Sequence, residues 1–464
     1  MPDDIVFLDI AEAAALLVAG ELSPLELVRA HLERIDALDG QLSAFLCVTA
    51  ERALAEAATA GVEFKAGRHR GPLHGIPFGL KDVYDTAGIP TTGNSPAYSN
   101  RIPKKDATVV RRLSEAGAIL LGKQATHELT YGGVSAELPW PIPRNPWSLD
   151  HDTGGSSSGS GAAVASGMSM FALGTDTGGS VRNPAAYCGV VGFKPSFGLV
   201  SRTGVMRNSF SFDHCGPLAR SVRDIALILD VIAGYDADDP FSTPGAFGQS
   251  FQQNLESGVK DWKIGVLADL YERELPVGDE ARAAMTAALA TFAELGAQAE
   301  VARISSVERY AQCKALIQKP EIYEEYKDEL AARPSDFGRK FLARISGGKD
   351  ISAATYLAAQ RERRVLTAEI DALFDDFDVL VTAGPPGPNL AADVAANWSF
   401  DRAEITVPFS LAGVPAISLC IGFTAVGLPL SMQIIGPQSG DRAVLRAAQA
   451  YQLATSWHRR RPPL

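Results

Sequence analysis

The chain has 464 residues, of which 46% are hydrophobic, and its formal net charge is -11 at pH 7. A chain of this length buries a large core, in one big domain or in two to three ordinary ones. The acidic balance argues against a nucleic-acid surface, because phosphate binding draws on clustered Lys and Arg. The basic end, His458-Arg459-Arg460-Arg461, is typical of a solvated tail, since like charges in a block repel one another.

The first residues and the cysteines indicate a reducing, aqueous compartment. Residues 1–5 carry Asp3 and Asp4 where a secretory signal carries basic residues, and no apolar run reaches the roughly 18 residues of a membrane span. The five cysteines are widely spaced and form no C-x-x-C pair, which favours reduced thiols over a disulfide frame. We therefore expect a cytoplasmic protein that binds neither membrane nor nucleic acid.

The chain starts with a helical lead. Ser23-Pro24-Leu25-Glu26 is a capping box with proline at the first helical position. Apolar residues follow at three- and four-residue spacing, which predicts an amphipathic helix. They are Leu25, Val28, Leu32, Ile35 and Leu38. Ala-rich helical turns continue to about residue 60, and the basic stretch 65–70 predicts a loop.

Short β-type runs alternate with helical ones between residues 73 and 235. This alternation predicts an α/β fold with a central sheet. The expected strands are residues 76–80, 118–121 and 171–173, and the expected helices are residues 108–116 and 160–166.

The composition changes after residue 235, and further strand-like runs appear toward the C-terminus. Residues 263–267 predict a strand and residues 279–295 a helix, whereas the dense charges between Glu321 and Arg364 predict surface helices that cap the site. Three further strands are expected near 379–381, 417–420 and 430–435. We divide the chain into a lead (1–65), a catalytic core (66–235), a helical insertion or cap (236–375) and a C-terminal part (376–464) that completes the same sheet, all within one compact domain.

The best candidate nucleophile is Ser180, in the loop Thr177-Gly178-Gly179-Ser180. The two glycines free successive N–H groups to point at one oxyanion, and each such donor lowers a barrier by ~3 kcal/mol. We therefore expect the N–H groups of Thr177, Gly178, Gly179 and Ser180 to form an oxyanion hole. A bare Gly-Gly-Ser is most often an incidental turn, so the context has to decide.

A second serine-bearing loop, residues 154–159, supplies that context. The segment between the loops is poor in bulk, so it can pack its backbone against the sheet and bring them together. A serine needs a base, and no histidine is near in sequence. Lys81 can serve if Ile76, Pro77, Phe78 and Leu80 bury it, because desolvation lowers the pKa of a lysine. The more common role of a lone lysine is a surface charge.

The sequence contains no motif that indicates a metal site or a cofactor site. None of the seven histidines forms H-E-x-x-H, and His127-Glu128 lacks a second histidine one turn later. Neither G-K-[ST] nor a G-x-G-x-x-G after a strand occurs, which argues against a nucleotide loop. We expect no metal and no cofactor.

With these residues in view, the segment from Gly154 to Ala185 resembles the signature of the amidase signature family. The similarity extends over six more segments, in the family's order, from about residue 70 to the end. They are Gly75 to Pro77 with Lys81-Asp82, Gly117 to Lys123, Arg144 to Trp147, Lys194 to Gly198, Gly216 to Val222 and Ala412 to Ala416.

The resemblance implies a mixed, twisted sheet covered by helices on both faces, and a Ser-cisSer-Lys triad. Its members fall on Ser180 as nucleophile, Ser156 as the bridging serine after a cis peptide, and Lys81 as the base. Asp176, Arg182 and Ser157 match supporting positions. Tyr131 and Gly132 align with a segment that lines the acyl pocket in relatives.

The resemblance implies hydrolysis of an amide, carbamoyl or ureido bond of a small molecule, without a cofactor. An alternative is the glutaminase subunit of a tRNA-dependent amidotransferase. In those subunits an Asp precedes the Thr of a Thr-x-Pro segment by three residues, whereas Thr406-Val407-Pro408 has Ala403 there, with Asp401 and Glu404 close by. The absence of an N-terminal span argues against the membrane-bound relatives.

Two further functions stay open. Gly155 to Gly159 also fits the G-x-S-x-G elbow of α/β-hydrolases with His458 as a late histidine, but that elbow needs a strand before it, where residues 147–152 are polar. The second is a non-catalytic assembly subunit that kept the fold. Assembly as a homodimer is open as well. We expect specificity to come from residues 300–375 and from the loops near Trp398 and Phe400.

Overall fold

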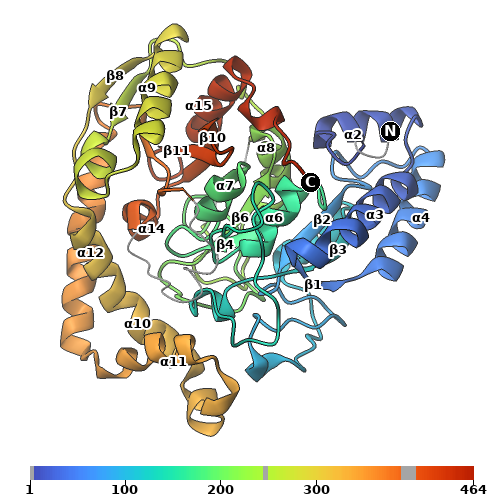
Figure 1. The fold of residues 1–464 in the computed structure, drawn as a ribbon, viewed down its shortest axis with the longest axis horizontal. Helices are drawn as coiled ribbons and strands as arrows, with labels where there is room; N and C mark the ends of the chain where they lie inside the picture. The colour runs from blue at the N-terminus through green and yellow to red at the C-terminus, as the bar shows by residue number, and fades with distance from the viewer. Residues whose placement is uncertain (1–4, 244–248, 388–403) are drawn as a thin grey trace.

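The computed structural model describes residues 5–243, 249–387 and 404–464. Its eleven described strands form one mixed sheet (Figure 1). The order of the strands in the sheet is β1-β3-β2-β4-β6-β5-β10-β11-β9-β7-β8. The strands are β1 (Phe45–Val48), β2 (Pro77–Lys81), β3 (Ile119–Gln124), β4 (Phe171–Asp176), β5 (Val191–Lys194), β6 (His214–Ala219), β7 (Lys263–Val266), β8 (Gln298–Val301), β9 (Val379–Ala383), β10 (Ala416–Phe423) and β11 (Pro429–Ile435). Every strand expected from the sequence is present, and β1, β5, β6 and β8 are additional. The expected α/β class with a mixed sheet between helices is confirmed.

Helices lie on both faces of this sheet. They include α2 (Ile10–Ala19), α3 (Pro24–Leu42), α4 (Ala50–Lys65), α5 (Thr108–Glu115), α6 (Ser158–Ala165), α7 (Arg182–Cys188), α8 (Val222–Ile232), α9 (Asp279–Glu294), α10 (Val307–Ala332), α11 (Arg339–Ile345), α12 (Ala353–Leu373), α14 (Val407–Ala412) and α15 (Asp441–Ala454). The predicted capping box of α3 forms, because Ser23 accepts from the Glu26 N–H and Glu26 bonds back to the Ser23 N–H. It fixes where this helix begins.

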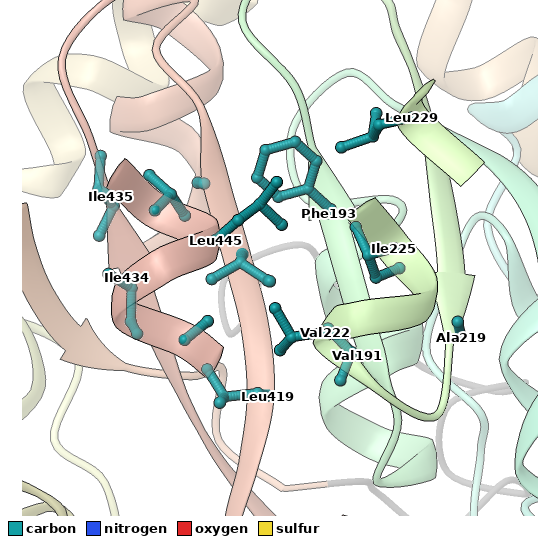
Figure 2. Close-up of a cluster of buried hydrophobic side chains, with 14 of the residues drawn as sticks. Val191, Phe193, Ala219, Val222, Ile225, Leu229, Leu419, Ile434, Ile435 and Leu445 are labelled. Atoms are coloured by element: carbon teal, nitrogen blue, oxygen red, sulfur yellow. The ribbon is translucent and has the colours of Figure 1, made fainter. Parts of the chain in front are cut away.

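Alternation along the strands separates two cores. Phe171 and Leu173 of β4 belong to the largest apolar cluster, whereas Ala172 between them packs with residues of α6 and α7. This is the two-residue period of a strand that is buried on both faces. On the first face, α8 and α15 cover the middle of the sheet, where Phe193, Ile225 and Leu445 meet (Figure 2).

Three neighbouring strands, β3, β2 and β4, run parallel to one another. Their carboxyl ends therefore lie at one edge of the sheet, which is where open α/β sheets build their sites. Lys81 is the last residue of β2, and the Ser180 loop follows the end of β4. The helix α6 enters at the same edge with Ser156 just before it.

The charged segment forms a helical arm, with α10 and α12 side by side and α11 near its end (Figure 1). It follows β8 and precedes β9. The expectation of helices is correct, but one carboxylate of the segment is not on the surface. Glu321 is buried and accepts hydrogen bonds from Ser211 Oγ (2.5 Å), Tyr356 OH (2.8 Å) and Ser209 Oγ.

All four predicted parts of the chain contribute strands to this sheet, and the division itself stays a prediction. No helix among the described residues is both long and apolar enough to cross a bilayer.

Candidate active site

Lys81 is fully buried, and its ammonium nitrogen lies between two hydroxyls. Lys81 Nζ is 2.7 Å from Ser156 Oγ and 2.7 Å from Thr175 Oγ1, with the Thr175 carbonyl at 3.4 Å. Burial lowers the pKa of Lys81 to about 7, against the opposing charges of Asp176 and Asp213. Burial thus favours the neutral form of this lysine, and a neutral amine can accept a proton.

Ser156 follows a cis peptide bond with Gly155, as the resemblance implied. The ring of His127 covers this bond so closely that a Cβ on Gly155 would lie 2.0 Å from His127 Cε1. The Ser156 carbonyl accepts from the His127 N–H at 3.1 Å. Glycine is therefore required here, and His127 holds Ser156 in place.

The two serine-bearing loops meet. The Ser157 N–H donates to the Ser180 carbonyl at 3.1 Å, and the Ser157 hydroxyl lies between the N–H (3.3 Å) and carbonyl (3.4 Å) of Thr175. Small residues allow this approach, because a Cβ on Gly174 would lie 2.6 Å from Ser157 Oγ. Ser180 itself is half-buried, whereas Lys81 and Ser156 lie behind it out of solvent.

Asp176 and Arg182 form a buried pair that shapes the Ser180 loop. Arg182 donates to Asp176 from Nε (3.0 Å) and Nη2 (3.1 Å), and also to Ser410 Oγ (2.7 Å) and Gln433 Oε1 (2.9 Å). Burial alone would raise the pKa of Asp176, but Arg182 holds it below its usual range. The pair ties the loop to α14 and β11, so the supporting positions do lie around the loop.

One expected oxyanion donor is already engaged. The Gly179 N–H donates to Asp176 Oδ1 at 2.7 Å, so it is not available to a substrate in this conformation. The N–H groups of Thr177, Gly178 and Ser180 stay candidates. The Thr177 hydroxyl donates to Asp213 (2.6 Å), which also accepts from the N–H groups of residues 208 and 209 and thereby fixes the start of the loop.

Tyr131 and Gly132 follow a strained turn in which Leu129 and Thr130 have φ values of 46° and 60°. Branched and bulky residues rarely adopt such angles outside functional sites. The Tyr131 ring is almost fully buried under the Arg344 guanidinium of α11, 3.9 Å away. The substrate role of both residues stays a prediction.

Sequence reasoning missed three residues that the fold brings to the site: Thr175, His127 and Asp213. Thr175 lies within the signature segment, but only the fold shows that its hydroxyl lies 2.7 Å from Lys81 Nζ. A cavity of about 230 Å³ reaches Thr175 along β6 and is also lined by Asp213. Within the described ranges, no three His, Cys, Asp or Glu side chains gather as metal ligands would.

Of the other positions named from the sequence, Ala403, Asp401, Trp398 and Phe400 lie outside the described residues. His458 lies in a short helical turn near the C-terminus (Trp457–Arg459) and is half-buried. The residues before Gly155 form turns and loops rather than the strand that an α/β-hydrolase elbow requires.

In sequence and fold, the chain is similar to amidases and to amidotransferase subunits. The family model described as Amidase matches residues 26–445. The A-type subunit of glutamyl-tRNA(Gln) amidotransferase from Synechococcus sp. (strain JA-3-3Ab) is 39% identical, covering 97% of this chain and 92% of the relative. A chain from the complex that reveals the evolutionary origins of an s-triazine catabolic enzyme is 34% identical, with TM-score 0.89 over 96% of this chain and 98% of that one. Peptide amidase from Stenotrophomonas maltophilia is 30% identical, with TM-score 0.87 over 99% and 98%. The chain belongs to the amidase signature family.

Proposed function

We propose that this chain is an amidohydrolase that cleaves an amide bond, or a carbamoyl- or ureido-type bond, of a small molecule through an acyl-enzyme on Ser180. The observation that carries this proposal is the 2.7 Å contact between the buried Lys81 Nζ and Ser156 Oγ. A lysine whose pKa lies near 7 is a base at physiological pH, and its contact is a hydroxyl that can pass a proton on.

In the proposed first step, neutral Lys81 uses its two N–H groups for Thr175 and its lone pair for the Ser156 hydroxyl proton. Ser156 then takes the proton of Ser180 as Ser180 Oγ attacks the substrate carbonyl carbon. The tetrahedral oxyanion is stabilised by the free N–H groups of the loop, for which Thr177, Gly178 and Ser180 are the candidates.

In the second step the carbon–nitrogen bond breaks, and the same proton returns through Ser156 to the departing nitrogen. Ammonia or an amine leaves, and Ser180 stays acylated. Water, deprotonated along the same path, attacks the ester and restores Ser180. The cycle consumes one water molecule and no cofactor.

The nucleophile is tested by Ser180→Ala. The variant should lose more than a hundredfold in amide turnover while its thermal unfolding stays close to wild type, because Ser180 is half-buried in a loop. Ammonia release from a panel of aliphatic, aryl and ureido amides measures this, and a fluorophosphonate should label wild type at Ser180 only. Activity above a hundredth of wild type, or labelling of Ser157, would place the nucleophile elsewhere.

A second candidate is the glutaminase subunit of a tRNA-dependent amidotransferase, because the 39% identical relative carries that name. Against it stands Ala403 in place of the expected acidic residue. The isolated chain distinguishes the two: a clear preference for L-glutamine over simple amides, increased by partner subunits, favours the amidotransferase. Catalysis of neither reaction would leave a non-catalytic assembly subunit. The homodimer and the cytoplasmic location stay predictions, which sedimentation and fractionation test.

A further inference from the structure

Helix α10 of the arm holds the loop before β6, residues 207–213, through three side chains on one of its faces. Gln318 Nε2 donates to Asn208 Oδ1 (2.5 Å), and the Tyr326 hydroxyl donates to a backbone carbonyl of the same loop (2.8 Å). Glu321 lies between them on the helix and also contacts the loop. Residues three and eight positions apart on a helix share a face, so the three contacts act together.

Glu321 is the central residue of this face, and its carboxylate is buried. Its oxygens accept from the Ser209 hydroxyl, the Ser211 hydroxyl (2.5 Å), the Ser211 N–H (3.2 Å) and the Tyr356 hydroxyl (2.8 Å). The Arg363 guanidinium lies nearby and donates to the Ser211 carbonyl at 3.1 Å. A buried carboxylate is costly unless donors surround it, so these bonds fix the loop against the arm.

Ser209 connects Glu321 to a second buried carboxylate, that of Asp213. The Ser209 hydroxyl donates to Glu321, and the Ser209 N–H donates to Asp213 Oδ2 at 2.9 Å. Asp213 Oδ1 accepts from the Thr177 hydroxyl at 2.6 Å. Thr177 opens the loop that carries Ser180, and its N–H is one of the candidate oxyanion donors. Three hydrogen bonds, joined through Ser209 and Asp213, thus lead from the arm to the proposed oxyanion hole.

From this geometry, and resting on the proposed amidohydrolase function, we propose that Glu321 is a positioning residue, which holds Ser209 and Asp213 so that the Thr177 N–H points at the developing oxyanion. Glu321 itself acts at a distance, through the loop before β6. The oxyanion exists only in the transition state and the intermediate, so loss of this alignment lowers kcat and leaves KM nearly unchanged. The arm thereby sets the rate of the chemistry at the sheet edge.

The test compares two variants of Glu321 by steady-state ammonia release from the best amide of the panel. Glu321→Leu removes every acceptor contact and should lower kcat by about 10- to 100-fold, the cost of misplacing a catalytic group, with KM nearly unchanged. Glu321→Gln keeps the shape and one acceptor oxygen for the Ser211 N–H, and the hydroxyls around it can accept as well as donate. It should therefore keep kcat within about threefold of wild type.

A double variant shows whether Glu321 acts through the nucleophile loop. Thr177→Val removes the hydroxyl that Asp213 holds and should also lower kcat. If both residues serve one alignment, Glu321→Leu with Thr177→Val should lose hardly more than the worse single variant. Ser209→Ala, which removes only one hydroxyl of the link, carries the same test if Glu321→Leu does not fold.

Glu369→Leu is the matched control, because Glu369 of α12 is a carboxylate of the same arm with the same kinds of donor. It accepts from the Ser305 N–H (2.7 Å), the Ser305 hydroxyl (3.0 Å) and the Tyr310 hydroxyl (3.0 Å). These partners lie at the start of α10 rather than in the loop before β6, so kcat and KM should stay at wild-type values.

Equal losses of kcat in Glu321→Leu and Glu369→Leu would overturn the inference, since they would show a general effect of the arm. Additive losses in the double variant, or a change confined to KM, would overturn it too and leave the amidohydrolase in place. Cleavage of no amide by wild type would overturn both proposals.

Discussion

Three lysines of this chain, Lys81, Lys123 and Lys194, are fully buried, and their partners give them different chemistry. Lys123 pairs with the carboxylate of Asp82 at 3.0 Å, which favours its charged form. Lys194 donates to the carbonyls of Val414 (2.5 Å) and Pro195 (3.2 Å), which can only accept. Lys81 faces two hydroxyls, which can also donate. Lys123 also contacts a hydroxyl, Thr91 Oγ1 at 2.7 Å, but it has the Asp82 carboxylate beside it, whereas among the described residues Lys81 contacts hydroxyls without a carboxylate in direct contact.

Because Lys81 must be neutral to act, the acylation rate should rise with pH along one ionisation with a midpoint near 7 and hold into the alkaline range. Lys81→Ala should lose several orders of magnitude. Lys81→Arg should fare little better, since arginine stays protonated at any working pH. Single-turnover acylation measured between pH 5 and about 10 gives the profile.

His458→Ala is the control for this profile, since an ordinary histidine base would give a similar midpoint. It should keep most of the activity. His214 is a poorer control, because its ring is buried and Nδ1 lies 3.1 Å from the Asp176 carbonyl at the nucleophile loop. A folded His458→Ala enzyme without activity, or a Lys81→Ala enzyme with near-normal turnover, would refute the assigned base.

For single residues, the sequence reveals which residue types stand in a local motif. It does not reveal which residues contact one another across the sheet. Lys81, Ser156 and Ser180 stand in recognisable loops, and the cis peptide before Ser156 could be expected from the resemblance. Thr175 and Asp213 have no such signal, because their roles arise only when strands distant in sequence pair.

The packing of helix α6 depends on its side chains being small or absent. Its residues 158–165 are Ser, Gly, Ala and one Val, and all are buried. A Cβ on Gly159 would lie 2.2 Å from the carbonyl oxygen of Ala44 and 2.5 Å from the N atom of Ala125. Both are backbone atoms, which cannot move aside as a flexible side chain can. The close packing of α6 is what holds Ser156 at the sheet edge.

Gly159→Ala should therefore destabilise the protein by about 1–3 kcal/mol, although alanine is the better helix former. It should also lower kcat, because α6 and the bridging serine must shift. Gly40→Ala is the matched control: Gly40 is an exposed residue of α3, where a Cβ meets nothing within 4 Å. That variant should be more stable by about 0.5–1 kcal/mol.

Urea denaturation of both variants measures these changes. A Gly159→Ala protein as stable as wild type would show that α6 is not packed against residues 44 and 125 as described.

Element prediction succeeded where a periodic pattern was long and failed where strands are short or atypical. The strand β6 contains Gly216 and Pro217, which ordinarily mark edges or turns, yet pairs with both β4 and β5. All four residues of β8 are exposed, so it shows no apolar alternation. The strands β6 and β8 form because neighbouring strands present backbone N–H and C=O groups for pairing. This is an effect of tertiary structure rather than of local sequence propensity.

For the molecule as a whole, buried lysines make stability depend on pH. Burial lowers the pKa of Lys81 and of Lys194 to about 7, from the ordinary 10.5. Between these values the unfolded chain binds protons that the folded one does not, so the free energy of unfolding should rise with pH. The useful window is pH 7 to about 9, because buried thiols such as Cys215, whose pKa burial raises to about 12, act in the opposite direction above it.

In that window Lys194→Met should reduce the slope of unfolding free energy against pH by up to about 1.4 kcal/mol per pH unit. Urea denaturation at several pH values measures it, with exposed Lys327→Met as the control that keeps the slope. A wild-type stability that falls between pH 7 and 9 would contradict the neutral state of these lysines.

The order of the strands is the part of the fold that the sequence could not supply. Alternation predicts that strands exist, but it does not say that β10 pairs with β5 or that β9 lies between β11 and β7. Such neighbours are separated by long stretches of chain and are chosen by burial of the whole sheet. The resemblance to a family implied a mixed sheet between helices but not this order, and composition and periodicity did not give the order either.

The arm follows β8 and precedes β9, near one end of the strand order, whereas β2 and β4 lie toward the other. None of the backbone pairs between β2 and β4 involves the arm. This layout separates the part of the chain that can vary its outer surface from the part that holds the proposed triad.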